Sequence, residues 1–317
     1  MAIHKMIPAS KDYLWGGRKL IDNYGKETNK EIMAESWEIS SHPDGPSILQ
    51  DLQMPLSDYV KKHGVSVSGT NSQDFNDFPI LVKFIDAKDV LSIQVHPDDE
   101  YALKHENQFG KNEMWYILEA EPGATIYYGV KEDLSKEDFK KAIENDDILN
   151  VLNKVEVKPG DVIYVEAGTI HAIGKGIVLC EIQQNSNVTY RVYDFNRKDK
   201  DGNLRDLHIE QSIEVSNLDK TEVDFSPQGE LIQHEEYSQQ VLVDSKYFMT
   251  KLYDVKLETS FEVDSSSFVA LVCLEGELSV EDKEDRIDLV KGESLFIDAN
   301  SGLVSVRGFG KFLHISV

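Results

Sequence analysis

Alternating apolar and polar positions recur along most of the chain. Short runs rich in Val, Ile, Tyr and Phe are separated by Gly, Pro, Asn and Asp, which is typical of β-strands joined by turns. Because few helical crossovers separate these runs, the pattern predicts an antiparallel sandwich or barrel rather than a doubly wound sheet. The first series of predicted strands covers 78–87, 90–97, 113–120, 124–130, 161–168, 176–184 and 188–195.

Helical spacing is confined to insertions between these strands. The clearest covers 135–152, where Ser135 and Asp138 suit a capping box in front of an apolar stripe. Two shorter helices are expected at 56–62 and 98–105. The fold class is therefore mainly β with helical insertions.

A second strand series follows a dense polar and acidic stretch. That stretch covers 218–238, and it predicts a boundary between a domain of residues 1–235 and a domain of residues 236–317. The phrases LVCLEGELSV and KGESLFIDA resemble the two halves of a cupin barrel, but no His or Glu cluster accompanies them. We therefore expect a second, smaller cupin-like β-barrel without metal ligands.

Composition and charge narrow the class of protein. Apolar residues make up 40% and charged residues 28% of the 317 positions, as in soluble globular proteins. No apolar run approaches the roughly 18 residues of a membrane span, and Cys180 and Cys273 each lie in an apolar run, so a cytoplasmic protein without disulfides is expected. The formal charge of −24 disfavours nucleic acids and anionic membranes as partners. The number of chains in the assembly is left open, and a monomer is compatible with the sequence.

A polar trio occupies one face of the strand LSIQVHP. Ser92, Gln94 and His96 alternate with apolar residues, so their side chains point to the same side. Taken alone, the segment could equally be a half-exposed strand with a wet outer face. In GKNEMWYIL the same alternation places Lys111 and Glu113 together.

A second histidine follows a strand in PGDVIYVEAGTIHAIG, at His171. A lone histidine of this kind is more often structural than a ligand. With His96, Glu113 and the amide of Gln94, however, it completes a mixed nitrogen and oxygen donor set that suits Zn²⁺ or another divalent first-row ion with an open position. These donors alone do not separate a zinc enzyme from an iron oxygenase with two histidines and one carboxylate.

Local cations are needed if the substrate of so acidic a chain is a phosphorylated molecule. Arg191 lies in VTYRVYDFNR beside aromatic residues, and burying it without an anionic partner would be costly. Lys83, inside the apolar strand LVKFIDA, implies snorkelling or a bound anion. With Lys111, these residues supply the required cations.

At these residues the chain resembles the type I mannose-6-phosphate isomerases of the cupin superfamily, in their short bacterial form. The motifs that carry the resemblance occur in order through most of the first 200 residues: YLWGG, AESWEIS, LVKFIDA, LSIQVHPDDEYA, GKNEMWYIL, AGTIHAIG and TYRVYDFNR. The resemblance implies a cupin-type jelly-roll catalytic domain and a zinc-dependent interconversion of mannose 6-phosphate and fructose 6-phosphate. Two departures from a generic cupin are Glu166, where a proline is usual, and the lack of an Asn four residues after His171.

The resemblance also implies roles for individual residues. It assigns one zinc ion per chain to His96, Glu113 and His171 with Gln94 as a fourth ligand, the active-site arginine to Arg191, and contacts with the sugar phosphate to Lys83, Ser92 and Lys111. It does not identify the general base, for which Asp194, Glu181 and a metal-bound water are candidates. The competing functions are a cupin metal-dependent dioxygenase and a non-enzymatic sugar-phosphate-binding protein.

Overall fold

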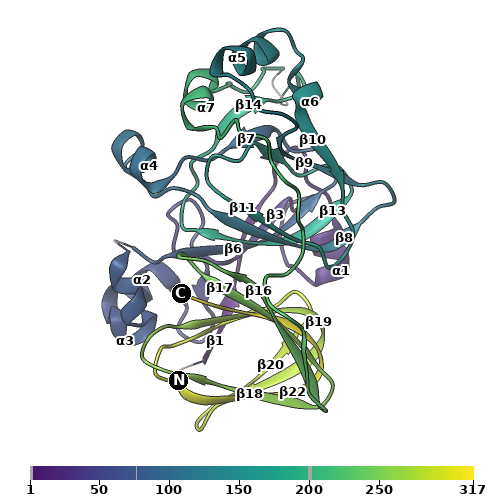
Figure 1. Ribbon diagram of the computed structural model, residues 1–317. Helices are drawn as coiled ribbons and strands as arrows, with labels where there is room; N and C mark the ends of the chain where they lie inside the picture. Colours follow the sequence, from purple (N-terminus) through teal and green to yellow (C-terminus); the bar gives the residue numbers. More distant parts are fainter. Residues whose placement is uncertain (1–2, 76, 199–201) are drawn as a thin grey trace.

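The computed structural model describes residues 3–75, 77–198 and 202–317, and its strands form three sheets, which confirms the expected mainly β fold. Figure 1 shows the strands late in the sequence gathered in one half of the molecule, and helices α5, α6 and α7 at the opposite end. None of the described helices is both long and apolar enough to span a membrane.

A six-stranded antiparallel sheet occupies the centre of the molecule, in the order β11-β8-β13-β6-β3-β2. Its register places Glu181 between Lys83 on one neighbouring strand and Trp115 on the other. The bounds of its strands are β2 (Ala9–Lys11), β3 (Glu35–Ile39), β6 (Ile80–Ala87), β8 (Glu113–Ala120), β11 (Val162–Val165) and β13 (Ile177–Gln184).

A five-stranded sheet follows in the order β10-β9-β12-β7-β14. Here His171 pairs with Gln94, and Gln94 in turn pairs with Arg191, so three predicted site residues lie side by side on neighbouring strands. The bounds are β7 (Ile93–Val95), β9 (Thr125–Val130), β10 (Leu152–Glu156), β12 (His171–Ala172) and β14 (Tyr190–Tyr193).

The third sheet joins the two ends of the described chain. Strand β1 pairs with β21 through Ile3 and Ile297, although β1 lies on the N-terminal side of the predicted boundary at residue 235. The division into two domains stays a prediction. The bounds are β1 (Ile3–Ile7), β4 (Ile48–Leu49), β5 (Met54–Pro55), β15 (Ile232–Gln233), β16 (Tyr237–Asp244), β17 (Met249–Val255), β18 (Glu258–Val263), β19 (Val269–Glu281), β20 (Arg286–Val290), β21 (Ser294–Ile297) and β22 (Gly302–Ser316).

The helices lie in the connections, as the sequence predicts. Two of the three expected helices are confirmed to within a residue at their ends, but the helix expected over 135–152 is wrong in its length. It ends at Glu144, and Asp146 takes the left-handed backbone conformation at φ 59° before a further short helix begins. The bounds are α1 (Lys19–Tyr24), α2 (Leu56–His63), α3 (Val65–Ser68), the 3₁₀ helix η1 (Thr70–Asp74), α4 (Asp99–His105), α5 (Lys136–Glu144), α6 (Ile148–Val151) and α7 (Ile209–Val215).

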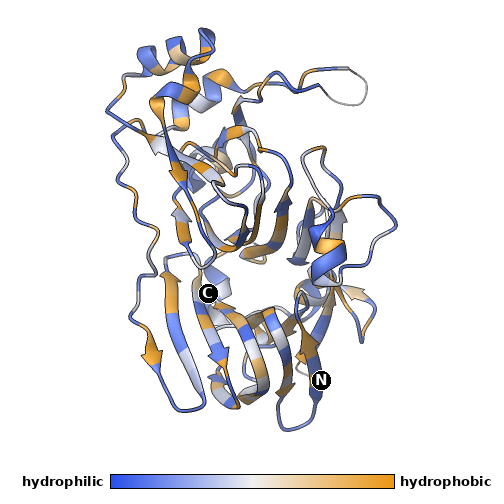
Figure 2. Cartoon of the chain, turned by 90° about the vertical axis from the view of Figure 1, so that its right-hand side faces the viewer, coloured by the Kyte–Doolittle hydropathy of each residue, from blue (hydrophilic) through white to orange (hydrophobic). Residues whose placement is uncertain are grey.

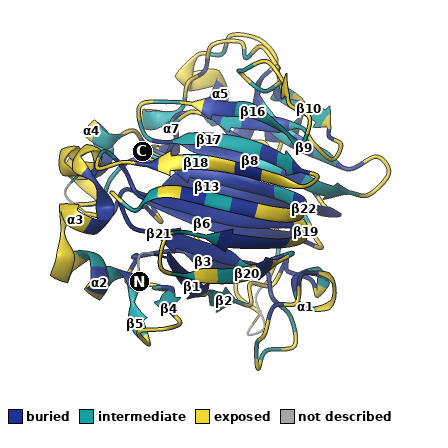
Figure 3. Ribbon diagram, turned by 90° about the horizontal axis from the view of Figure 1, so that it is seen from below, coloured by how far each residue is buried: buried dark blue, intermediate teal, exposed yellow. Residues whose placement is uncertain are grey.

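The central sheet is buried on both faces. Strand β13 is buried along its whole length, as Figure 3 shows. Its side chains alternate: Cys180 packs in a cluster that includes Ala270 of the third sheet, whereas Leu179 packs on the other face with Ile126 of the five-stranded sheet. This alternation is the period of two expected for a strand.

A long segment without a regular element, 216–231, connects α7 to β15. It runs along one side of the molecule in Figure 2. Backbone hydrogen bonds from Thr221 to Val130 and from Val162 to Phe225 fasten it to the first two sheets.

Candidate functional site

Three buried side chains meet between the central sheet and the five-stranded sheet. His96 directly follows β7, Glu113 opens β8, and His171 opens β12. Donor atoms of all three lie within 4.8 Å of one another, and no side chain of the three is more than 1% exposed. The structure therefore brings together the three residues that the sequence nominates as principal metal ligands.

The histidines present their Nε2 atoms to the shared space. His96 Nδ1 donates to the carbonyl oxygen of Val188 at 2.8 Å, and His171 Nδ1 donates to that of Thr169 at 2.8 Å. Such a bond on one ring nitrogen leaves the other free to act as a ligand. Burial lowers the pKa of His171 to about 4 and that of His96 well below its ordinary value, so both rings are neutral, as metal binding requires.

Glu113 provides the strongest reason to place a cation here. Its two oxygens lie 3.2 Å from His171 Nε2 and 3.7 Å from His96 Nε2, and burial raises its pKa to about 7. Lys111 Nζ approaches one oxygen at 2.8 Å, yet neither oxygen accepts a hydrogen bond of acceptable geometry from the residues that the structure describes. A divalent cation would supply the missing partner of both oxygens, so the donor set fits a metal ion.

Gln94 lies at the edge of this cluster. Its Nε2 is 3.3 Å from His171 Nε2. Because the two ends of an amide have nearly the same shape, a half-turn of the amide places its oxygen at that position. The geometry is compatible with Gln94 as a fourth ligand, a role that stays a prediction.

A cavity of about 300 Å³ lies beside the cluster, and Gln94 and Lys111, which contact His171 and Glu113, belong to its wall. The four other nominated residues, Lys83, Ser92, Lys111 and Arg191, all lie in its wall, as does Gln94. The lining is completed by Tyr13, Trp15, Glu35, Ile85, Leu91, Ile173, Glu181, Asn187, Thr189 and Arg205.

The ammonium groups in this cavity already face carboxylates. Lys83 Nζ donates to Glu181 at 2.9 Å and lies 3.9 Å from Glu35. Although burial alone would raise it, the pKa of Glu181 falls to about 2 because of the charges of Lys83 and Lys111. Trp115 Nε1 donates to the second oxygen of Glu181 at 3.1 Å, so this carboxylate is ionised and fixed in place.

Two charged residues of the pocket were not recognised in the sequence as site residues. Glu35 lies within the motif AESWEIS, which could have suggested it, but Arg205 lies in no motif and only the fold brings it to the cavity. Asp194, a candidate base, accepts hydrogen bonds from Arg205 and Arg197 on its two oxygens. Burial opposes their effect, yet these arginines hold its pKa below the ordinary value.

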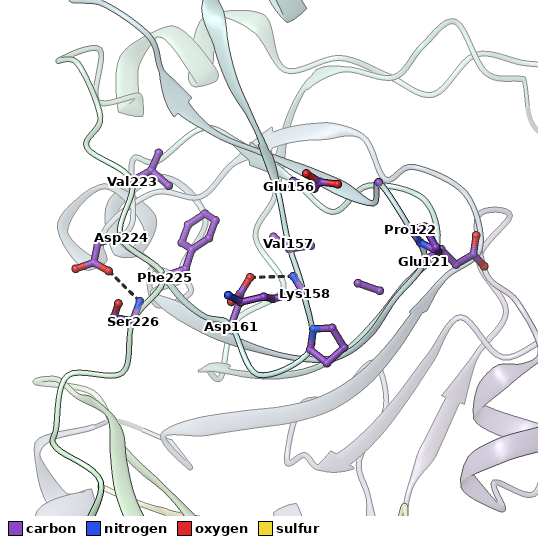
Figure 4. A pocket seen from close by; sticks show the side chains of 13 residues that line it. Glu121, Pro122, Glu156, Val157, Lys158, Asp161, Val223, Asp224, Phe225 and Ser226 are labelled. Carbon is purple, nitrogen blue, oxygen red and sulfur yellow. Dashed lines mark hydrogen bonds between the residues drawn. The ribbon is translucent and has the colours of Figure 1, made fainter.

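A second, larger cavity of about 590 Å³ lies at the loops after β8 and β10 and along the segment 216–231. Figure 4 shows two of its carboxylates in local turns: Asp161 accepts a hydrogen bond from the backbone of Lys158, and Asp224 accepts one from that of Ser226. Its lining contains no histidine or cysteine. The chemistry therefore concentrates in the smaller cavity.

The fold and this site define a mainly β protein of the cupin type with a candidate metal centre. Residues 3–123 match the model of the type I phosphomannose isomerase catalytic domain, and residues 238–317 match that of the mannose-6-phosphate isomerase cupin domain. The chain belongs to the type I mannose-6-phosphate isomerases, a family of enzymes.

Relatives match over nearly the whole chain. The mannose-6-phosphate isomerase of Streptococcus mutans is 38% identical over 90% of this chain and 88% of its own length. ManA, the mannose-6-phosphate isomerase of Bacillus subtilis, is 35% identical over 96% of this chain and 95% of its own. A crystal structure of the mannose 6-phosphate isomerase from Bacillus subtilis superposes with a TM-score of 0.92 at 30% identity and covers both chains completely.

Proposed function

We propose that this protein is a zinc-dependent aldose–ketose isomerase that interconverts mannose 6-phosphate and fructose 6-phosphate in the cytoplasm. The observation that carries the proposal is the buried cluster of His96, Glu113 and His171 beside a cavity lined by cations. The names of the relatives agree with it.

The residues divide into those that would hold the metal and those that would face the sugar. His96, Glu113 and His171 would hold zinc, with Gln94 as a fourth ligand, and bound zinc would supply a Lewis acid for the carbonyl and hydroxyl oxygens at C1 and C2. Isomerisation moves a proton from C2 to C1 through an enediol, whose oxygens carry developing negative charge. Arg191, in the wall of the cavity, would stabilise that charge.

The remaining groups would orient the substrate and move the proton. Ser92, Lys83 and Lys111 line the same cavity and would contact the substrate. Asp194 is unsuited to accept the C2 proton, because both of its oxygens accept hydrogen bonds from guanidinium groups. Binding energy from the phosphate would hold C1 and C2 in place, so unphosphorylated mannose should be a poor substrate.

The test is fructose 6-phosphate formation from mannose 6-phosphate by the purified protein, before and after chelation and with zinc restored. We expect activity to be lost on chelation and regained with zinc. Glu113→Gln is the matched variant: it keeps the shape of the side chain but removes the anionic donor, so it should bind less zinc and stay inactive. Absence of isomerase activity in the zinc-loaded wild type would contradict the proposal, and an oxygen-uptake assay on the same sample would then separate a dioxygenase from a binding protein.

A further inference from the structure

Three arginines converge around one carboxylate at the edge of the cavity. Arg205 holds Asp194 in a two-point contact, Nε to Oδ2 at 2.7 Å and Nη2 to Oδ1 at 2.5 Å, and Arg197 Nη2 reaches Oδ1 at 2.6 Å. Asp194 is only 6% exposed. Arg205 is thereby fixed in one orientation, and it lines the cavity together with Arg191.

Three guanidinium groups face two carboxylates, Asp194 and Asp206, so the described side chains do not fully balance the positive charge of this cluster. Arg191 bonds through Nη1 to the backbone oxygen of Asp206 rather than to a carboxylate. The buried Nε atoms of Arg191 and Arg197 have no hydrogen-bond partner among the described residues. Unsatisfied buried donors and excess guanidinium charge, in a chain whose net charge is −24, favour an anion with several oxygens.

The other cations of the cavity each lie against a carboxylate. Lys83 is paired with Glu181 at 2.9 Å, and Lys111 with Glu113 at 2.8 Å. An anion that approached either ammonium would meet the neighbouring carboxylate. The guanidinium end is consequently the more favourable place for a phosphate group.

The strand register separates this end from the candidate metal centre. Strands β7 and β14 run antiparallel, with Gln94 opposite Arg191 and Ile93 opposite Tyr193. Ser92 therefore lies toward the Asp194 end, whereas His96 lies toward the other. At about 3.3 Å per residue, the four steps from 96 to 92 span about 13 Å, so an anion near Arg205 would be well separated from a metal at His96.

We propose that Arg205, positioned by Asp194, binds the phosphate of the substrate and sets the preference of the enzyme for a phosphorylated sugar. This inference rests on the proposed function. Arg205 follows the first series of predicted strands and lies in none of the sequence motifs, so the sequence alone did not suggest it as a phosphate-binding residue.

The test compares Arg205→Gln with Arg307→Gln, which removes the same charge from an exposed arginine on β22 that pairs with Glu258. In Arg205→Gln the KM for mannose 6-phosphate should rise about tenfold or more, because hydrogen bonds to charged groups contribute about 1.5–3 kcal/mol, while kcat should fall by a smaller factor because the other contacts still hold C1 and C2. The inhibition constant of inorganic phosphate should rise in parallel. Arg307→Gln should leave all three values unchanged.

Arg205→Lys and Asp194→Asn test the positioning. Lysine keeps the charge but cannot make the two-point contact, so its KM should fall between those of the wild type and Arg205→Gln. Asp194→Asn should raise KM with Arg205 present. If circular dichroism shows that Arg205→Gln does not fold, Arg205→Lys is compared with Arg307→Gln and the wild type in its place. An unchanged KM and unchanged phosphate inhibition in the folded variants would overturn the inference.

Failure of the proposed function can be distinguished from failure of this inference. If zinc-loaded wild type does not isomerise mannose 6-phosphate, calorimetric titration with inorganic phosphate replaces the kinetic readout. Binding that is weaker in Arg205→Gln than in Arg307→Gln would support the phosphate site without the isomerase. Equal binding in the two variants would refute it.

Discussion

Glu181 illustrates how single residues are fixed in this site. Lys83 and Trp115 bond to its two oxygens from the strands on either side of β13. All three side chains are buried. The ion pair and the hydrogen bond between them offset the free-energy cost of burying these polar groups. The wall opposite the five-stranded sheet is therefore rigid before any ligand arrives.

Arg191→Ala should lower kcat by about 10²–10³, the usual cost of losing one group that stabilises developing charge. Its zinc content should equal that of the wild type, because no atom of Arg191 belongs to the donor cluster. Steady-state kinetics with metal analysis of the same sample checks both. Loss of zinc in proportion to activity would contradict the assigned role.

Sequence reasoning predicted the cluster because strand alternation restricts where side chains point. Gln94 and His96 had to share a face, and the fold confirms that they lie near His171 and Glu113. Arg205 could not be predicted in this way. It reaches the cavity through a loop after β14, and no periodicity fixes the path of a loop.

At the scale of elements, the helix cap of α5 is the clearest local prediction. Ser135 accepts a hydrogen bond from the backbone of Asp138, as the capping pattern predicts. However, apolar residues continue at helical spacing beyond Glu144, and this spacing predicts one longer helix. Asp146 interrupts it with a left-handed conformation, which Asp adopts more readily than most residues.

Ser135→Ala should destabilise α5 by about 1 kcal/mol through loss of the cap. Ser135→Thr keeps a hydroxyl and serves as the control. Because α5 packs on the five-stranded sheet and not in the donor cluster, activity at 25 °C should not change. Hydrogen exchange of the α5 amides measures the effect, and equal protection in the alanine variant and the wild type would show that the cap contributes nothing.

At the scale of the whole molecule, a buried ion pair connects the central sheet to the third sheet. Lys26 Nζ lies 2.6 Å from Glu38 of β3, and both are buried. The same ammonium donates to the carbonyl oxygen of Gly292, and Ser294 of β21 donates to Glu38 at 2.9 Å. The contact therefore depends on the correct placement of one sheet on the other.

Glu38→Gln should destabilise the protein by about 3–5 kcal/mol, because it leaves the ammonium of Lys26 buried without its counter-charge. The double variant Lys26→Met, Glu38→Gln should recover much of that loss, since no uncompensated charge remains. Thermal unfolding of the two variants and the wild type makes the comparison. Equal stability of the single and double variants would contradict it.

His4 of β1 gives the stability a dependence on pH. It contacts Asp51 at 3.0 Å and Tyr59 at 3.2 Å, and lies 3.7 Å from Asp298. Burial opposes protonation, but the bonds to Asp298 and Asp51 outweigh it and raise the pKa above 6.5. A raised pKa in the folded state means that the contribution is complete below about 6.5 and is lost as pH rises through the folded-state value.

Between about pH 6 and pH 9, the wild type should therefore lose more stability than His4→Gln, which cannot titrate at this position. Urea unfolding at both pH values measures the difference. Parallel pH profiles for the two proteins would show that His4 does not contribute. His4 lies in the third sheet, so His4→Gln should keep the activity of the wild type. The isomerase assay at fixed pH therefore serves as the control that the candidate active site is intact in the variant.

The pairing of β1 with β21 also affects how the chain is made. Ile297 leaves the ribosome long after its partner Ile3, because most of the described chain lies between them. At about 5–20 residues per second, translation leaves β1 without its partner for about 15–60 s. During that interval its edge is open to wrong pairing with other nascent chains, so production of this protein should depend on chaperone capacity more than its final stability would suggest.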